Sequence, residues 1–193
     1  MRSGADEAIS PKYAHIERER RWLVDPTTRP DFSDAPYARI EDHYIQGTRM
    51  RLRRMTDNVS GECALKLTKK YEANDPLARP IVTTYLSNEE FELIASLPAQ
   101  FLRKRRYKVM FAENEFCIDV FEGPLSGLEL AEIECPDGVA LRKIARPSWA
   151  ICDVSETLAF QGGQLVSLDA VSLASLLNQQ SRAEISNDPY VAP

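Results

Sequence analysis

Histidine and closely spaced cysteine, the ligands of many metal sites, are scarce in this sequence. It contains two histidines, His15 and His43, which are too few for a histidine-rich site, so any bound metal must have oxygen ligands. The cysteines include no close pair of the type that binds zinc; they are Cys63, Cys117, Cys135 and Cys152. Their spacing leaves disulfides open, but free thiols in a cytoplasmic protein are the simpler interpretation.

Long apolar runs, glycine-rich phosphate loops, internal repeats and low-complexity tracts are also missing. No run is long enough to cross a bilayer, and the polar N-terminus lacks the apolar core of a signal peptide. The net charge of −5 argues against general binding to nucleic acid, which a basic chain would favour. We therefore expect a cytoplasmic protein with neither a membrane nor a nucleic-acid polymer among its partners.

The size and composition are those of one soluble domain with a substantial core. The chain has 193 residues, of which 44% are hydrophobic and 27% are charged. We expect a flexible lead-in over residues 1–12, a single domain over 13–182 and a C-terminal tail over 183–193. The sequence leaves the oligomeric state open, a homodimer included.

The segment over residues 16–24, Ile-Glu-Arg-Glu-Arg-Arg-Trp-Leu-Val, predicts an unusual strand. Because side chains alternate along a strand, Glu17, Glu19 and Arg21 would share one face. Two carboxylates and a guanidinium fit a wet, functional interior, since burying them without partners is costly. Taken alone, the segment is explained equally well as an exposed face of mixed charge.

The same alternation returns in four other segments. The polar residues that recur at every second position, in most cases with apolar residues between them, are Arg49, Arg51 and Arg53; Lys66 and Thr68; Lys104 and Arg106; and Glu132 and Glu134. Any one of these strands could belong to a half-buried sheet with its charges in solvent. Five of them, with basic and acidic sets kept apart, predict an α+β fold. In this fold an antiparallel closed β-barrel of about eight strands has its charged face inside and helices packed outside.

Turn-forming residues divide the chain into short elements. Strands are predicted over residues 13–24, 39–46, 48–55, 62–71, 81–86, 101–112, 115–122 and 128–135. Ser87 and Glu90 have the spacing of a capping box, which predicts a helix from there to Pro98. Further helices are predicted over residues 139–144, 153–160 and 169–180.

One family has these motifs in the same order. Glu17-x-Glu19-x-Arg21, followed by Trp22-Leu23-Val24, resembles the N-terminal ExExK signature of the CYTH superfamily, the triphosphate tunnel metalloenzymes. Over roughly residues 13–165 the further motifs are Arg51-Leu52-Arg53, Lys66, Lys104-x-Arg106-Tyr107, Asp119-Val120-Phe121-Glu122-Gly123 and Glu132-x-Glu134. The resemblance implies a tunnel that holds a triphosphate, with a divalent metal on its acidic side. Activities in the family include hydrolysis of inorganic, thiamine or nucleoside triphosphates and cyclisation of ATP.

Two sets of side chains form the candidate site. The expected substrate-binding cations, which could surround a linear polyanion, are Arg21, Arg51, Arg53, Lys66, Lys104 and Arg106. The expected ligands of Mg²⁺ or Mn²⁺, hard ions that accept oxygen ligands, are Glu17, Glu19, Asp119, Glu132 and Glu134. The expected catalytic residues are Glu19, Arg21 and Glu134. Salt bridges inside the barrel are the alternative interpretation of the carboxylates, and Asp119 could instead orient a ligand.

The predicted function is metal-dependent hydrolysis of a small-molecule triphosphate. Inorganic triphosphate is the first candidate, because no aromatic pair is evident that would hold a base. The alternatives are an adenylate cyclase and a module that binds polyphosphate or a nucleotide without turnover. Three features depart from the family pattern. Arg21 replaces a lysine, Thr83 lies in a strand where many members have an acidic residue, and residues 160–165 only loosely match the segment that helps close one tunnel end.

Overall fold

The structure is a computed structural model that describes residues 11–187, and the side chains of residues 11–180. Residues 1–10 of the predicted lead-in and residues 188–193 of the predicted tail lie outside the described residues. The predicted end of the domain at residue 182 falls inside a helix that continues to Asn187.

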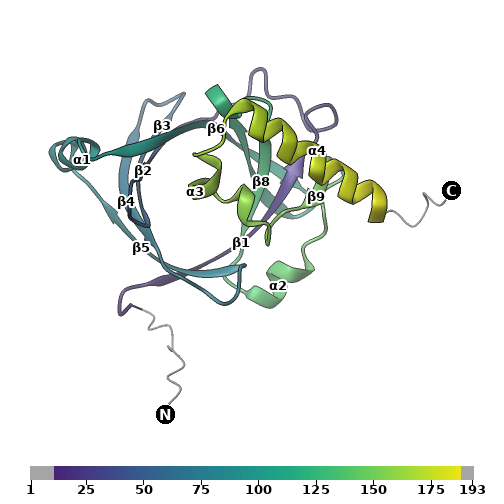
Figure 1. Ribbon diagram of the computed structural model, residues 1–193, viewed down its shortest axis with the longest axis horizontal. Coiled ribbons are helices and arrows are strands. Elements are labelled where there is room, and N and C mark those ends of the chain that lie inside the picture. The colour runs from purple at the N-terminus through teal and green to yellow at the C-terminus, as the bar shows by residue number, and fades with distance from the viewer. Residues whose placement is uncertain (1–10, 188–193) are drawn as a thin grey trace, which may run out of the picture.

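A closed barrel is the centre of the fold. Within residues 11–187, nine strands form one antiparallel sheet in the order β5-β4-β3-β2-β6-β7-β8-β1-β9, and a further pairing of β5 with β1 closes eight of them into a barrel (Figure 1). The strands are β1 His15–Val24, β2 Ala38–Ile45, β3 Met50–Asp57, β4 Cys63–Lys70, β5 Ala78–Tyr85, β6 Ala99–Phe111, β7 Asn114–Phe121, β8 Glu129–Glu134 and β9 Ala150–Asp153. The predicted α+β fold with a closed antiparallel barrel is confirmed.

The pairing register places charged residues of neighbouring strands side by side on the inner face. Arg21 pairs with Glu132 across β1 and β8, and Arg106 pairs with Asp119 across β6 and β7. The residues between them point outward, as Trp22 does, and Trp22 is fully buried in an outer core. The period of two therefore separates a charged interior from an apolar exterior that helices and loops must cover.

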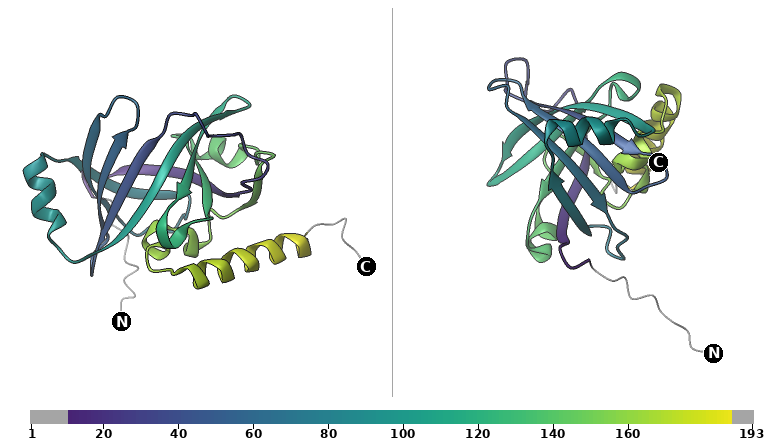
Figure 2. Two further views of the ribbon diagram at one scale, coloured as in Figure 1. Left: turned by 90° about the horizontal axis from the view of Figure 1, so that it is seen from above. Right: turned by 90° about the vertical axis from the view of Figure 1, so that its left-hand side faces the viewer.

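Helices cover the outside of the barrel, and the short segment over residues 158–165 packs against part of its inner face. α1 (Asn88–Ala95) begins at Ser87, which forms the predicted capping box with Glu90, and Phe91 packs beneath it against Leu52. The remaining helices are the 3₁₀ helices η1 Gly123–Leu125 and η2 Leu158–Phe160, and the α-helices α2 Gly138–Lys143, α3 Gly162–Leu165 and α4 Ala170–Asn187. Figure 2 shows α1 and α4 on opposite sides of the barrel. No helix in residues 11–187 combines the length and the apolar character needed to span a membrane.

Part of the inner face is apolar. Leu102, Phe121 and Leu130 lie at inward positions of their strands and pack with Phe160 and Leu165, which come from η2 and α3. This packing fills one side of the interior and leaves the charged remainder as a cavity.

Strand β5 begins earlier than predicted. It starts at Ala78 and includes Pro80, although proline lacks the N–H that a strand interior requires. Pro80 lies where the β4–β5 pairing ends, and its carbonyl still accepts a hydrogen bond from the N–H of Tyr71. Because only one donor is lost at the end of the ladder, the strand tolerates this proline.

The helix predicted over residues 153–160 is wrong in its first half. Asp153 ends β9, and only Leu158–Phe160 is helical, as a single 3₁₀ turn. The physical reason is the geometry of β1. Strand β5 pairs with β1 only over residues 15–18, so the edge beyond is open, and β9 pairs there with residues 22–24.

Candidate functional site

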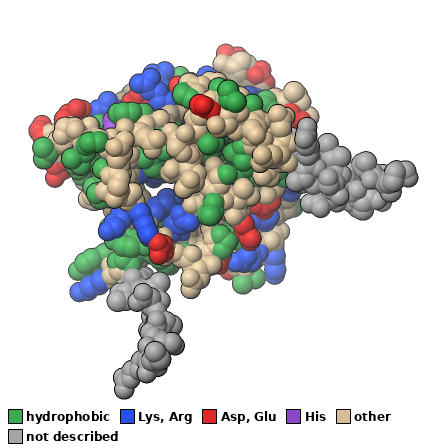
Figure 3. All heavy atoms as spheres, in the orientation of Figure 1, with side chains coloured by type: hydrophobic (Ala, Val, Ile, Leu, Met, Phe, Trp, Pro, Cys, Tyr) green, Lys and Arg blue, Asp and Glu red, His purple; other side chains and the backbone are tan. Residues whose placement is uncertain are grey.

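The inner face of the barrel surrounds a cavity of about 490 Å³. Charged side chains of β1, β3, β6 and β8 line this cavity, and residues 160–165 form one side of it. Figure 3 shows an opening in the molecule with Lys and Arg side chains at its edge. The volume lies within the range of about 300–1,000 Å³ that is usual for small-molecule sites.

In one wall of the cavity, two arginines lie close to the same buried carboxylate. Asp42 is 1% exposed, and its two oxygens accept hydrogen bonds from Nε and Nη2 of Arg53 at 2.6 and 2.7 Å. Nε of Arg51 lies 3.6 Å from the same carboxylate and makes no hydrogen bond within the described residues. Burial by itself raises the pKa of Asp42, but the charges of Arg53 and Arg51 outweigh burial and hold the pKa well below its usual value. Asp42 therefore stays ionised and fixes Arg53, whereas Arg51 is held at a longer distance.

A second buried carboxylate, Asp119, anchors Lys104 and Arg106. Asp119 is 0% exposed; Nε and Nη2 of Arg106 donate to its two oxygens at 2.7 Å each, and Nζ of Lys104 also donates to it. Nη2 of Arg106 also donates to Glu132. Burial lowers the pKa of Lys104, and the neighbouring charge of Arg106 lowers it further, although Asp119 opposes both. Asp42 and Asp119, with the arginines and the lysine that they hold, are called the paired region below.

Arg21 links the paired region to the rest of the cavity. Its Nε donates to Glu132 at 2.8 Å, its Nη2 to Glu19 at 3.0 Å and its Nη1 to the carbonyl of Phe160 at 3.1 Å. Its backbone N–H donates to Oγ of Ser155 at 2.8 Å. Burial by itself lowers the pKa of Arg21, but the charges of Glu132 and Glu19 outweigh burial and raise the pKa above the usual value. Arg21 is therefore a fixed and permanent cation.

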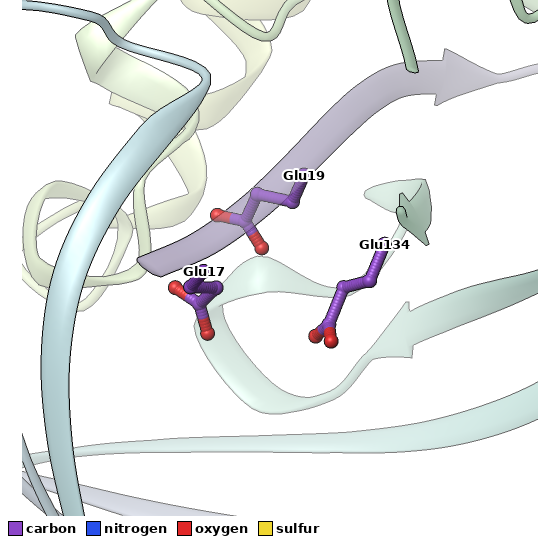
Figure 4. A group of neighbouring side chains, drawn as sticks. All are labelled: Glu17, Glu19 and Glu134. Carbon is purple, nitrogen blue, oxygen red and sulfur yellow. The ribbon is translucent and has the colours of Figure 1, made fainter. Parts of the chain in front are cut away.

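Glu17 and Glu19 of β1 and Glu134 at the end of β8 form an acidic cluster, drawn in Figure 4. One carboxylate oxygen of each residue lies within 4.8 Å of the others. Nζ of Lys70 lies 2.5 Å from Glu17 and 3.8 Å from Glu19, while no ion pair joins Glu134 to a cation of the described residues. Burial raises the pKa of Glu134, and the charges of Glu17 and Glu19 raise it further. The chain thus leaves this cluster short of positive charge.

The donor set of the acidic cluster fits a hard divalent cation. Carboxylate oxygens are the ligands that Mg²⁺ and Mn²⁺ accept most readily, and no softer sulfur or imidazole ligand belongs to the cluster. A divalent ion would also remove the repulsion that raises the pKa of Glu134. The residues that would hold such an ion are Glu17, Glu19 and Glu134.

The other two predicted metal ligands have different neighbours. Asp119 and Glu132 bind cations of the chain, Asp119 through Lys104 and Arg106, and Glu132 through Arg21 and Arg106. Burial by itself raises the pKa of Glu132, but Arg21, Lys104 and Arg106 lower it well below its usual value. For these two carboxylates the geometry matches the alternative interpretation, salt bridges inside the barrel.

All predicted substrate-binding cations except Lys66 line the cavity. Nζ of Lys66 instead lies over the ring of Tyr85, 5.0 Å from its centre. On the same stretch of the inner face, the hydroxyls of Thr68 and Thr83 are 2.9 Å apart. Thr83 therefore contributes to a neutral hydroxyl pair on the inner face.

Residues that line or support the cavity and were not predicted as site residues include Asp42, Tyr44, Lys70 and Arg79. Lys70 continues the alternation of Lys66 and Thr68, so the pattern that found Lys66 could also have found it. Asp42 and Tyr44 gave no clear signal, because both faces of their predicted strand carry polar side chains. Arg79 was assigned to a loop that the structure replaces with the start of β5.

Residues 160–165 form their side of the cavity by close backbone packing. A Cβ atom on Gly162 would lie 1.9 Å from Oη of Tyr44, so only glycine fits there without movement of the tyrosine. Nη1 of Arg79 donates to Oε1 of Gln161 at 3.2 Å, and the Phe160 carbonyl accepts from Arg21. This segment is thus tied directly to charged groups of the site.

Comparison with known proteins identifies the fold. No protein-family model matches the sequence, and no curated protein matches it. The crystal structure of the inorganic triphosphatase NE1496 aligns with a TM-score of 0.50 and 22% identity, covering 81% of this chain and 94% of that chain. A second structure of NE1496 has the same TM-score and identity and covers 81% and 97%. The PH1819 protein from Pyrococcus horikoshii OT3 has a TM-score of 0.47 and 18% identity, covering 85% and 99%. At 22% identity, the likeness to NE1496 shows a shared barrel fold.

Proposed function

We propose that this protein is a metal-dependent phosphohydrolase that cleaves a triphosphate inside the barrel. The observation that carries the proposal is the separation of charge in the cavity. Fixed cations of β3 and β6 are backed by buried carboxylates, whereas the acidic cluster of β1 and β8 is only partly compensated by Lys70 and Arg21, and its Glu134 has no ion pair within the described residues. A linear polyanion with a bound divalent ion is complementary to both parts. The similar barrel of NE1496, an inorganic triphosphatase by name, agrees with this proposal.

The cations of the paired region are suited to hold phosphate oxygens. Asp42 and Asp119 keep Arg53, Lys104 and Arg106 in place, so these cations need little reorganisation when a charged ligand arrives. Arg51, whose Nε lies 3.6 Å from Asp42, is held less tightly than Arg53 and has more freedom to turn toward a phosphate. Binding and orientation of the substrate are assigned to this region.

Proton transfer is assigned to the carboxylates. Arg21 cannot accept a proton, because an arginine that is already protonated has no basic site, and Glu132 and Glu19 raise its pKa further. Glu19 and Glu134, which belong to the acidic cluster at the cavity, are the groups placed to orient water and accept its proton. A divalent ion held by the acidic cluster would supply charge stabilisation to the phosphoryl oxygens. Arg21 binds and orients.

Inorganic triphosphate is the proposed substrate, because the lining aromatic residues offer little for a base. Phe121 and Phe160 are only 5% and 0% exposed, and Tyr44 packs against Gly162. Among the described lining residues, Tyr71 is then the one ring with a face for stacking, and Lys69 lies over it at 5.2 Å from the ring centre. A single ring does not form the aromatic pair that would clamp a base.

The test is a phosphate-release screen of the full chain on inorganic triphosphate, nucleoside triphosphates and thiamine triphosphate, with cyclic AMP assayed in parallel. We expect the fastest release from inorganic triphosphate, loss of activity in a chelator, and recovery on addition of Mg²⁺ or Mn²⁺. Full activity in the chelator would overturn the role of metal. Cyclic AMP as the main product would indicate a cyclase, and tight binding without turnover would indicate a binding module.

A further inference from the structure

Lys70 has a place in the cavity that the proposed reaction has not yet used. Its ammonium group lies 2.5 Å from Oε2 of Glu17 and 3.8 Å from Oε1 of Glu19, on the edge of the acidic cluster. Its side chain is 28% exposed and lines the cavity. Lys70 is therefore the flexible cation of the cluster, whereas Arg21, the other cation that contacts Glu19, has three acceptors that fix it.

We propose that Lys70 is an internal counter-ion that a divalent cation displaces from the acidic cluster, and that the displaced ammonium then binds the phosphate chain. The first step requires only that the cluster binds a divalent ion. The second step rests on the proposed function. Together they make Lys70 a positioning residue that couples metal binding to substrate binding.

The competition follows from the space around Glu17 and Glu19. A magnesium ion takes oxygen ligands at about 2.0–2.1 Å, and the ammonium of Lys70 already lies against one oxygen of Glu17 and near one of Glu19. A divalent ion and an ammonium group bound to the same carboxylates repel each other strongly in a partly buried site. The divalent ion has the larger charge and the better ligand set, so the ammonium is the group that moves.

The displaced ammonium has somewhere to go. Lys70 has a flexible four-carbon stem and three rotatable donors, so its position is not fixed in the way that a forked guanidinium is. It shares the cavity with Arg51 and Arg53, on the neighbouring strand β3, which are proposed to hold phosphate oxygens. An ammonium that moves away from Glu17 therefore stays in a part of the cavity that is lined by arginines, where phosphate is proposed to bind. The metal-free chain avoids an uncompensated cluster, and the metal-bound chain gains one more phosphate donor.

The experiment measures Mn²⁺ binding to the full chain without any phosphate, by electron paramagnetic resonance of free Mn²⁺. Removing the competitor in Lys70→Met is expected to tighten Mn²⁺ binding about tenfold. Lys69→Met is the matched control. This variant removes the same charge from the adjacent position, but Lys69 is exposed on the opposite face of β4. The affinity of the Lys69→Met variant for Mn²⁺ is therefore expected to stay within about twofold of wild type. Lys70→Arg, which keeps a competing cation, is expected to resemble wild type.

Several outcomes would overturn the proposal. Unchanged or weaker Mn²⁺ binding in Lys70→Met would mean that Lys70 does not compete with metal. Equal tightening in Lys69→Met would mean that general loss of positive charge is responsible. Lys70→Gln repeats the measurement if the methionine variant does not fold, with circular dichroism as the check of folding.

The second step has its own readout. If the displaced ammonium binds phosphate, KM for inorganic triphosphate rises about tenfold in Lys70→Met while Mn²⁺ binding tightens; an unchanged KM would overturn this step. Absence of turnover in the wild type would refute the proposed function and leave the Mn²⁺ titration interpretable. Turnover with no competition would refute the role of Lys70 and leave the proposed function in place.

Discussion

The paired region and the acidic cluster use the same residue types and differ in how the chain compensates them. Asp42 and Asp119 are almost completely buried, and each accepts hydrogen bonds from cations fixed in place. Glu134 is exposed at the cavity, has no ion pair within the described residues, and has a raised pKa. A carboxylate that the chain itself compensates supports the shape of the site. A carboxylate that the chain leaves uncompensated is available to a ligand from solution.

The largest expected effect is a loss of stability when a buried carboxylate of the paired region is neutralised. Asp42→Asn leaves Arg53 buried beside a neutral amide, and we expect a loss of about 3–5 kcal/mol in the free energy of unfolding, measured by urea denaturation. Glu41→Gln is the matched control. Its carboxylate lies on the outer face, 3.5 Å from an exposed arginine, Arg103, and its loss is expected to cost less than about 1 kcal/mol. Equal losses would mean that burial of Asp42 gives the pair no special role.

The next prediction concerns Arg21, which donates to Glu19 of the acidic cluster and shares Glu132 with Arg106 of the paired region. Arg21→Ala removes the partner of Glu19 and Glu132, and we expect kcat/KM for triphosphate to fall at least about 100-fold. Arg21→Lys keeps the charge and is expected to retain measurable activity. Wild-type kinetics in the alanine variant would show that this residue never touches the substrate. A rate that appears only in the lysine variant would mark the natural protein as a binder.

A smaller effect is expected at the wall between Tyr44 and α3. Gly162→Ala would place a Cβ atom 1.9 Å from Oη of Tyr44, so the ring must move, and we expect a loss of about 1–3 kcal/mol together with a higher KM. Gly163→Ala is the control, because its Cβ would make only an ordinary contact of 3.9 Å with the same ring. Similar melting temperatures and KM values for the two variants would show that the Tyr44 ring can move without loss of stability or of substrate binding.

The smallest expected effect is a gain in stability, whereas the variants above lose stability or activity. Because the folded state raises the pKa of Glu134, that state binds protons more readily than the unfolded chain, and stability falls as pH rises through the raised pKa. Glu134→Gln should therefore stabilise the metal-free protein by about 0.5 kcal/mol at about pH 8, after allowance for solvent screening, and not at about pH 4. Thermal unfolding at both pH values measures this. Glu132→Gln, which breaks ion pairs with Arg21 and Arg106, should destabilise instead.

Much of the fold could be read from the chain because its signals are local. The alternation of charge along β1, β3 and β8 depends only on the period of a strand, and the capping box at Ser87 depends only on residues three apart. Strand β9 could not be read in this way. It forms because β5 leaves the end of β1 unpaired, which is a fact about strands distant in the sequence.

By itself, the sequence determined which side chains face the interior, since a period of two assigns each residue to one face of its strand. Only the tertiary structure decided which partners those side chains have. Glu132 and Glu134 share one face of β8, yet one binds Arg21 and Arg106 and the other belongs to the acidic cluster. Lys66 and Lys70 share one face of β4, yet one lies over Tyr85 and the other binds Glu17. Residues two apart on a strand are separated by about 6–7 Å, more than the length of an ion pair. The closure and pairing register of the barrel therefore decide which charge meets which.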